Sequence, residues 1–240
     1  MKQKHLLLAG IFAIFSLFLS SCWFLGPSVR GNGNVTEEVR PVSDFDQIEV
    51  SRGMNVYVTQ GSPAKLVVVA DNNLHEIIET RVEGHTLKIF ATENIRWARE
   101  KKVLVTVEKL TGLETSSGAN AWSQNQITTE SLDVSSSSGS NLTMDVNAKY
   151  LKAGCSSGAN INLSGMAKEA ELKASSGANL IGNDLKTDEC KMKASSGANV
   201  SAIVNERLEA HASSGGNVVY SGEPKTTEVN TSSGGNIRKR

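Results

Sequence analysis

The chain has 240 residues, with 25 basic and 25 acidic side chains. This balance gives no reason to expect a nucleic-acid partner, which usually requires a basic excess. Hydrophobic residues make up 39% of the chain, enough to build a core, and 21 glycines indicate many turns, as in a regular all-β repeat.

The first 21 residues are predicted to be a signal peptide. Lys2 and Lys4 precede an apolar run from Leu6 to Leu19, which is shorter than the roughly 20 residues of a membrane span. The run ends in Leu19-Ser20-Ser21-Cys22, which resembles the lipobox of bacterial lipoproteins. The resemblance implies cleavage before Cys22 and acylation of its thiol, so that buried acyl chains hold the protein at a membrane. The alternative is a secreted protein cleaved near Ser21.

Residues 22–34 are then predicted to be a lipidated tether, and the membrane is the first predicted partner. We expect a cell-envelope location with the anchor in the outer membrane. No acidic residue lies between Cys22 and Glu37, which slightly favours the periplasmic face, but the sequence leaves the choice between periplasmic and surface exposure open.

Residues 35–110 alternate apolar and polar side chains with period two, which is typical of strands. Val103, Val105 and Val107 are one example, and Gln60-Gly61-Ser62-Pro63 is a turn between two such runs. Leu74, Ile77 and Ile78 have helical spacing, so Asn73 to Thr80 is predicted as a short helical turn, with a strand as the alternative.

Residues 111–240 contain the strongest pattern, seven copies of Ser-Ser-Gly-x-Asn at nearly constant spacing. Alternating runs such as Leu172-x-Ala174 flank each copy. A period near 20 with strand alternation predicts an all-β fold, a parallel β-helix or β-solenoid with coils of about 19–21 residues. Glycine would allow positive φ, asparagine amides of stacked coils would form a ladder, and serine would fill tight inside corners.

An eighth copy, Ser51-Arg52-Gly53-Met54-Asn55, lies upstream. The stretch from Gly53 to Gly118 is about three repeat lengths. We therefore predict one solenoid domain over residues 35–240, with degenerate coils in 35–110 and regular coils in 111–240. The predicted turn and ladder residues are Gly53, Asn55, Gly118, Asn120, Gly139, Asn141, Gly158, Asn160, Gly177, Asn179, Gly197, Asn199, Gly215, Asn217, Gly234 and Asn236.

Several motifs are similar to those of a bacterial family described as "putative auto-transporter adhesin, head GIN domain". They are Arg40-Pro-Val-x-x-Phe45-x-x-Ile48, Val50-x-x-Gly-x-x-Val56-x-Val58, Leu87-x-Ile89 and the Ser-Gly-Asn repeats. The resemblance covers roughly residues 34–238. It implies a right-handed β-helix and little about activity. The family is common in lipoproteins of Bacteroidetes.

No catalytic, metal or cofactor site is predicted. The histidines beyond the signal peptide, His75, His85 and His211, are isolated. The repeated pentapeptide is not a Gly-x-Ser-x-Gly elbow, and seven copies suit a scaffold better than a nucleophile that is needed once. Its neutral asparagines, in place of carboxylates, argue against a calcium ladder.

Two further features concern lysines and cysteines. Lys152, Lys173 and Lys193 precede the pentapeptides and suggest a basic stripe that could contact an anionic glycan, although a solvated strand face is the simpler interpretation. Cys155 and Cys190 are predicted to be buried free thiols, because a two-coil separation of about 9.6 Å exceeds the reach of a disulfide.

The sequence therefore predicts a non-catalytic envelope lipoprotein, an adhesin or scaffold that binds a glycan or an envelope protein. Two alternatives stay open: a polysaccharide lyase or hydrolase on a β-helix, and a structural assembly subunit. The ligand and the oligomeric state are not determined by the sequence.

Overall fold

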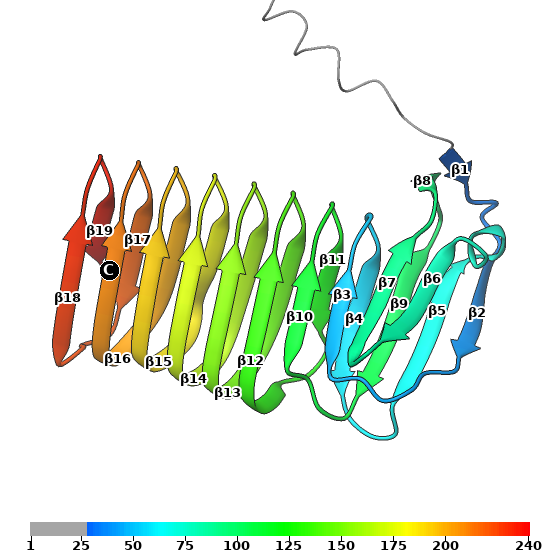
Figure 1. Cartoon of the computed structure of the whole chain (residues 1–240), viewed down its shortest axis with the longest axis horizontal. Coiled ribbons are helices and arrows are strands. Elements are labelled where there is room, and N and C mark those ends of the chain that lie inside the picture. Colours follow the sequence, from blue (N-terminus) through cyan, green and yellow to red (C-terminus); the bar gives the residue numbers. More distant parts are fainter. Residues whose placement is uncertain (1–27) are drawn as a thin grey trace, which may run out of the picture.

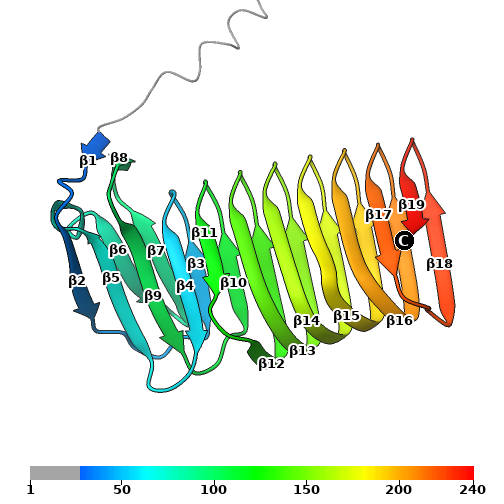
Figure 2. The same cartoon turned by 180° about the vertical axis from the view of Figure 1, so that it is seen from behind.

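The structure, a computed structural model, describes residues 28–240, so the predicted signal peptide and Cys22 lie outside the described residues. The described chain is almost entirely β and forms an elongated stack of coils (Figures 1 and 2). The predicted all-β parallel solenoid is confirmed. No helix in residues 28–240 could cross a membrane.

The regular coils follow one another along the stack in sequence order. Their strands are β10 (Gly112–Thr115), β11 (Asn120–Ser123), β12 (Ile127–Ser136), β13 (Asn141–Cys155), β14 (Asn160–Ala174), β15 (Asn179–Ala194), β16 (Asn199–Ala212), β17 (Asn217–Ser221), β18 (Thr226–Thr231) and β19 (Asn236–Lys239). Each long strand bends once and contributes to two opposing sheets. Its first half pairs in the sheet that follows the tight turns, and its second half pairs in the sheet that precedes them.

The tight turn at the end of each coil is made by the pentapeptide. In Ser156-Ser157-Gly158-Ala159, the amide of Ala159 donates to the carbonyl of Ser156 at 3.1 Å, and the two central residues have φ values of 53° and 70°. Positive φ at both central positions defines a type I′ turn, in which glycine carries no steric penalty. The same geometry recurs at all eight copies, from Arg52-Gly53 to Ser233-Gly234.

The core fills the space between the two sheets, because period-two alternation turns every second side chain inward. On β13, for example, Leu142, Met144 and Val146 point inward from one sheet, and Leu151 and Ala153 from the other. Stacking repeats this pattern in one continuous cluster of buried residues from Phe45 to Val218. A single coil could not bury this apolar surface alone, which is why the repeats must stack.

The N-terminal part adds β1 (Ser28–Arg30), β2 (Val35–Arg40), β3 (Gln47–Val50), β4 (Asn55–Gln60), β5 (Lys65–Asp71), β6 (Ile78–Glu83), β7 (Thr86–Ala91), β8 (Asn94–Trp97) and β9 (Lys101–Val107). Strands β3 and β4 form a regular coil that stacks in parallel directly on β10 and β11. On their other side they pair in parallel with β7 and β9.

This arrangement corrects the prediction of degenerate coils throughout residues 35–110. Strands β2, β5 and β6 run antiparallel to their neighbours and close the end of the stack. The intervening segment does not lie between Gly53 and Gly118. It folds back beyond β3 and β4, so two coils that are far apart in the sequence become direct neighbours. The predicted helical turn is a short 3₁₀ helix at Asn72–Leu74, and the chain from Ile78 is strand β6.

Asp71 fastens the N-terminal segment to the loop before β9. Its buried carboxylate accepts backbone hydrogen bonds from Gly33 at 2.8 Å, Glu100 at 3.1 Å and Arg99 at 3.2 Å. Burial by itself would raise the pKa of Asp71, but the three amide donors and the nearby Arg99 charge favour the ionised form and hold the pKa below its usual value.

Candidate ligand-binding face

The asparagines of the pentapeptides form a continuous ladder along one edge of the stack. Each side-chain amide donates to the side-chain carbonyl of the preceding coil, for example Asn160 to Asn141 and Asn179 to Asn160, both at 2.9 Å. The complete series joins Asn55, Asn120, Asn141, Asn160, Asn179, Asn199 and Asn217. Because the amides hydrogen-bond to one another, this edge holds successive coils together.

The serines of the pentapeptide do not fill inside corners, contrary to the sequence expectation. In the turn at Ser156 and Ser157 the first serine is half-buried and the second is exposed at the tip. The tight inward position belongs to the fourth residue, which is the fully buried Ala159 in that coil. Ser140 occupies the same position in another coil, where its hydroxyl lies 2.8 Å from that of Ser136 and 3.1 Å from that of Thr115.

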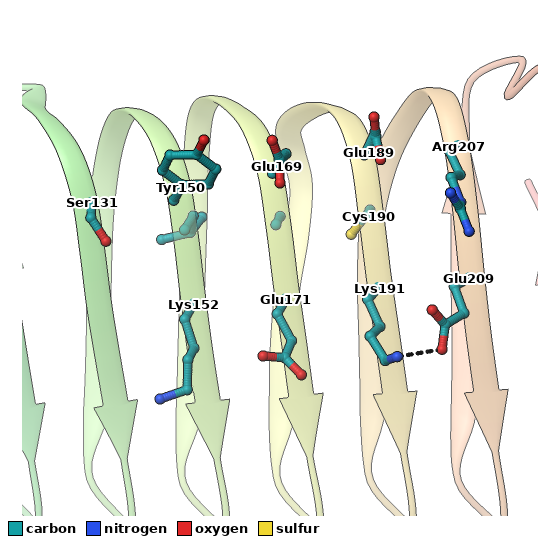
Figure 3. Close-up of a pocket in the computed structure, with 12 residues that line it drawn as sticks. Ser131, Tyr150, Lys152, Glu169, Glu171, Glu189, Cys190, Lys191, Arg207 and Glu209 are labelled. Carbon is teal, nitrogen blue, oxygen red and sulfur yellow. Dashed lines mark ion pairs between the residues drawn. The ribbon is translucent and has the colours of Figure 1, made fainter.

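The outer face of the sheet before the turns carries parallel rows of charged and polar side chains. One row lies six residues before each glycine and consists of Asp133, Lys152, Glu171, Lys191 and Glu209 on adjacent strands. Its charges alternate. Lys152 pairs with Asp133, and Lys191 pairs with Glu209, as Figure 3 shows. Glu171 pairs instead with Lys173. This row is therefore largely neutralised by its own neighbours.

These ion pairs shift the pKa values in the row so that the charged form of each group is favoured. Hydrogen bonds from Lys173 to Glu171, and from Lys191 and His211 to Glu209, lower the pKa of each carboxyl group. Hydrogen bonding to Asp133 raises the pKa of Lys152. The carboxylates therefore stay ionised at neutral pH, which does not suit a general acid.

A second row lies eight residues before each glycine, next to the bend of the coil. It places Tyr150, Glu169, Glu189 and Arg207 side by side on β13 to β16. All four residues are exposed, and Figure 3 shows them above the alternating row, with the Arg207 side chain extending along its strand toward Glu209. Within residues 28–240 no ion pair involves Glu169, Glu189 or Arg207. Their polar atoms are available to a ligand.

The two rows line an open groove of about 450 Å³. Tyr150 stands at one side with 42% of its surface exposed, and Lys149 lies 5.1 Å from its ring centroid. Cys190 contributes to the floor, but burial raises the pKa of its thiol to about 12, so no thiolate nucleophile is present at neutral pH. The groove offers carboxylates, cations and one aromatic ring across adjacent strands.

The three lysines singled out in the sequence do not form one stripe. Gly154, two residues after Lys152, is the residue that pairs with Lys173, so Lys152 belongs to the alternating row of Asp133 and Glu171. Lys173, Lys193 and His211 are neighbours in a shorter basic row. Lys152 lies six residues before its glycine, whereas Lys173 and Lys193 lie four residues before theirs, so the three lysines do not occupy the same repeat position.

The remaining histidines and cysteines of the sequence analysis do not form a common site. His75 contacts Glu38 and Thr36 at the N-terminal end, and His211 pairs with Glu209. Cys155 and Cys190 are free and buried, which confirms that prediction. Among residues 28–240 no group of three or more His, Cys, Asp or Glu side chains could hold a metal ion.

Comparison with known proteins supports this description. A family model described as "Putative auto-transporter adhesin, head GIN domain" matches residues 44–224. The chain belongs to this family. Its description indicates a protein of the cell envelope or cell surface. No curated protein matches the chain significantly.

Solved structures share the fold at low sequence identity. A "putative adhesin" from Bacteroides fragilis has a TM-score of 0.82 at 18% identity, covering 88% of this chain and 100% of its own. A "putative adhesin" from Parabacteroides distasonis has a TM-score of 0.69 at 20% identity, with 89% and 100% covered. A "putative lipid binding protein" from the same species has a TM-score of 0.67 at 19% identity, with 89% and 100% covered. At these identities the likeness concerns the fold alone.

Proposed function

We propose that this family member is a lipid-anchored adhesin of the outer membrane that binds a neutral glycan in the groove on β13 to β16 without transforming it. The observation that carries the proposal is the row of Tyr150, Glu169, Glu189 and Arg207, whose charges are not neutralised by one another. Family membership supports a role in adhesion.

The chemistry of this row suits a polyhydroxylated ligand. Carboxylates accept hydrogen bonds from hydroxyl groups, and an exposed tyrosine offers an apolar face with a polar tip. Parallel strands place successive side chains about 4.8 Å apart, so that a polymer lying across the strands would meet one polar group per coil. The flanking row is occupied by its own ion pairs, which confines the unoccupied donors and acceptors to the row beside the bend.

The test is a panel of neutral glycans presented to the full mature chain in detergent. We expect saturable binding of at least one neutral polysaccharide, and a loss of about tenfold or more for the double variant Tyr150→Ala/Glu169→Ala. Glu228→Ala, an exposed change on β18 outside the groove, is the matched control. Equal binding by the double variant and the control would refute the site, and release of reducing ends would replace adhesion by an enzymatic function.

The anchor has its own test. Metabolic labelling with a radioactive fatty acid should label the wild-type protein, while Cys22→Ala should remain unlabelled and leave the membrane fraction. Protease treatment of intact cells then separates the two faces of the outer membrane. Digestion supports surface adhesion, whereas protection of an acylated protein would contradict it.

A further inference from the structure

A second hollow lies on the opposite sheet, on the outer face of β4, β9 and β5. It has a volume of about 630 Å³ and is open to solvent. Its wall is Tyr57, its floor includes Val67 and Leu104, and its rim carries Lys65 and Lys102 together with the residues Thr59, Thr106 and Gln124. None of these residues belongs to the groove on β13 to β16.

The aromatic wall is held in place by the neighbouring coil. Tyr57 and Trp122 occupy the same repeat position, four residues after their glycines, and lie opposite one another on β4 and β11. Their ring centroids are 4.9 Å apart and the ring planes differ by 19°, which is a stacked pair. A stacked partner on one side restricts the tyrosine ring, so the wall is formed before any ligand arrives.

The floor is more apolar than the solvent-facing side of a sheet usually is. Strand β5 reads Leu66-Val-Val-Val-Ala70 and is therefore apolar on both faces, a pattern typical of strands that are covered on both sides. Its outward Val67 is the neighbour of Leu104, which is 38% exposed. At the corresponding positions on later coils, Thr143, Asn162 and Ser201 are polar, whereas Ile181 and Val219 are apolar.

The rim supplies charge and hydrogen-bonding groups around this floor. Lys102 already pairs with Glu100 at 2.9 Å. Lys65 is exposed at the hollow, and among the ion pairs of residues 28–240 none includes it. Thr59, Thr106 and Gln124 add two hydroxyls and one amide. A simple acyl chain would cover the apolar floor but would make no use of the charge of Lys65 or of these polar groups.

We propose that this hollow binds an acidic sugar residue, a hexuronate unit of an anionic polysaccharide. The apolar face of the pyranose ring would lie against Tyr57 and the floor, its hydroxyls would bond to Thr59, Thr106 and Gln124, and its carboxylate would pair with Lys65. This site is independent of the groove on β13 to β16 and differs from it in the charge of its ligand.

The experiment measures the fluorescence of Trp122 in the full mature chain in detergent. The substitutions Trp23→Phe and Trp97→Phe remove the other two tryptophans. The probe is an oligogalacturonate of defined length, and the neutral galactose oligomer of the same linkage is the comparison. We expect a saturable change in emission with the acidic oligomer, weakened by salt. Lys65→Gln should weaken binding about tenfold, because a charge-assisted bond is lost, and Tyr57→Leu should weaken it similarly.

The control variants separate this proposal from others. Lys225→Gln makes the same charge change at an exposed site outside the hollow and should bind like the parent. Tyr150→Ala/Glu169→Ala should also leave this binding unchanged. Equal affinity for the neutral oligomer, or equal affinity of Lys65→Gln and Lys225→Gln, would overturn the proposal. A saturable change in emission with a fatty acid, together with no change with oligogalacturonate, would also overturn it. Since Lys65 is exposed on the surface, its substitution tests the site even if Tyr57→Leu fails to fold.

Discussion

Replacing Asn160 with alanine removes two of the six side-chain hydrogen bonds in the asparagine ladder, the one donated to Asn141 and the one accepted from Asn179. Both bonds measure 2.9 Å between heavy atoms. The substitution leaves the turn unchanged, because the hydrogen bond from the Ala159 amide to the Ser156 carbonyl and the positive φ of Gly158 involve only the backbone.

The expected loss follows from the net value of such bonds. A neutral hydrogen bond contributes about 0.5–1.5 kcal/mol, which gives about 1–3 kcal/mol for two. Asn141 is exposed and Asn179 half-buried, so both can bond to water after the change. We therefore expect the lower part of the range, about 1–2 kcal/mol, and a fall in Tm of about 2–8 °C for a domain of this size.

Urea unfolding followed by far-ultraviolet circular dichroism measures this difference. Asn162→Ala is the matched control, because Asn162 lies two residues further along the same strand and is exposed. An exposed substitution of this kind should change the free energy of unfolding by less than about 0.5 kcal/mol. If the two variants unfold at the same urea concentration, the ladder bonds contribute no net stability and the reasoning is wrong.

Three further predictions follow from buried groups. Gly216→Ala should lower the free energy of unfolding, measured by thermal unfolding, by about 1–3 kcal/mol, because the added Cβ would lie 2.5 Å from the Ala194 carbonyl. Gly154→Ala is the control and should be neutral or slightly stabilising, since no atom lies within 4 Å of its added Cβ. Equal losses of stability in the two variants would contradict this packing. Asp71 has a lowered pKa in the folded state, so its stabilisation is complete above the unfolded value of about 3.8 and is lost as the pH falls through the folded pKa; the stability difference between wild type and Asp71→Asn should therefore narrow in acid, and a constant difference would refute it. Burial raises the pKa of Cys155 to about 11 and that of Cys190 to about 12, so a thiol reagent at pH 8 should label them only after unfolding, and rapid native labelling would contradict their burial.

The sequence by itself determined the repeat and its chemistry. Seven glycines at nearly constant spacing require stacked coils, since each coil has one inward face that only its neighbours can cover. Counting backwards from those glycines also identifies the outward rows. Tyr150, Glu169, Glu189 and Arg207 all lie eight residues before a glycine, so aligning the coils on their glycines groups them from the sequence alone. The inward Leu-x-Ala segments are a poorer guide, because Leu151 lies seven residues before its glycine and Leu172 only five.

Only the tertiary structure decided how the N-terminal segment joins the stack. Local alternation is the same for parallel and antiparallel strands, so it could not show that β2, β5 and β6 run antiparallel. Nor could spacing show that the coil of Gly53 lies directly against that of Gly118, across the whole of β5 to β9 in the sequence. That contact stacks Tyr57 on Trp122, and the pairing of β9 with β4 and of β5 with β9 on the other side completes the second hollow. The repeat fixes which side chains face outward, because alternation is local, whereas the order of the strands fixes which of them meet.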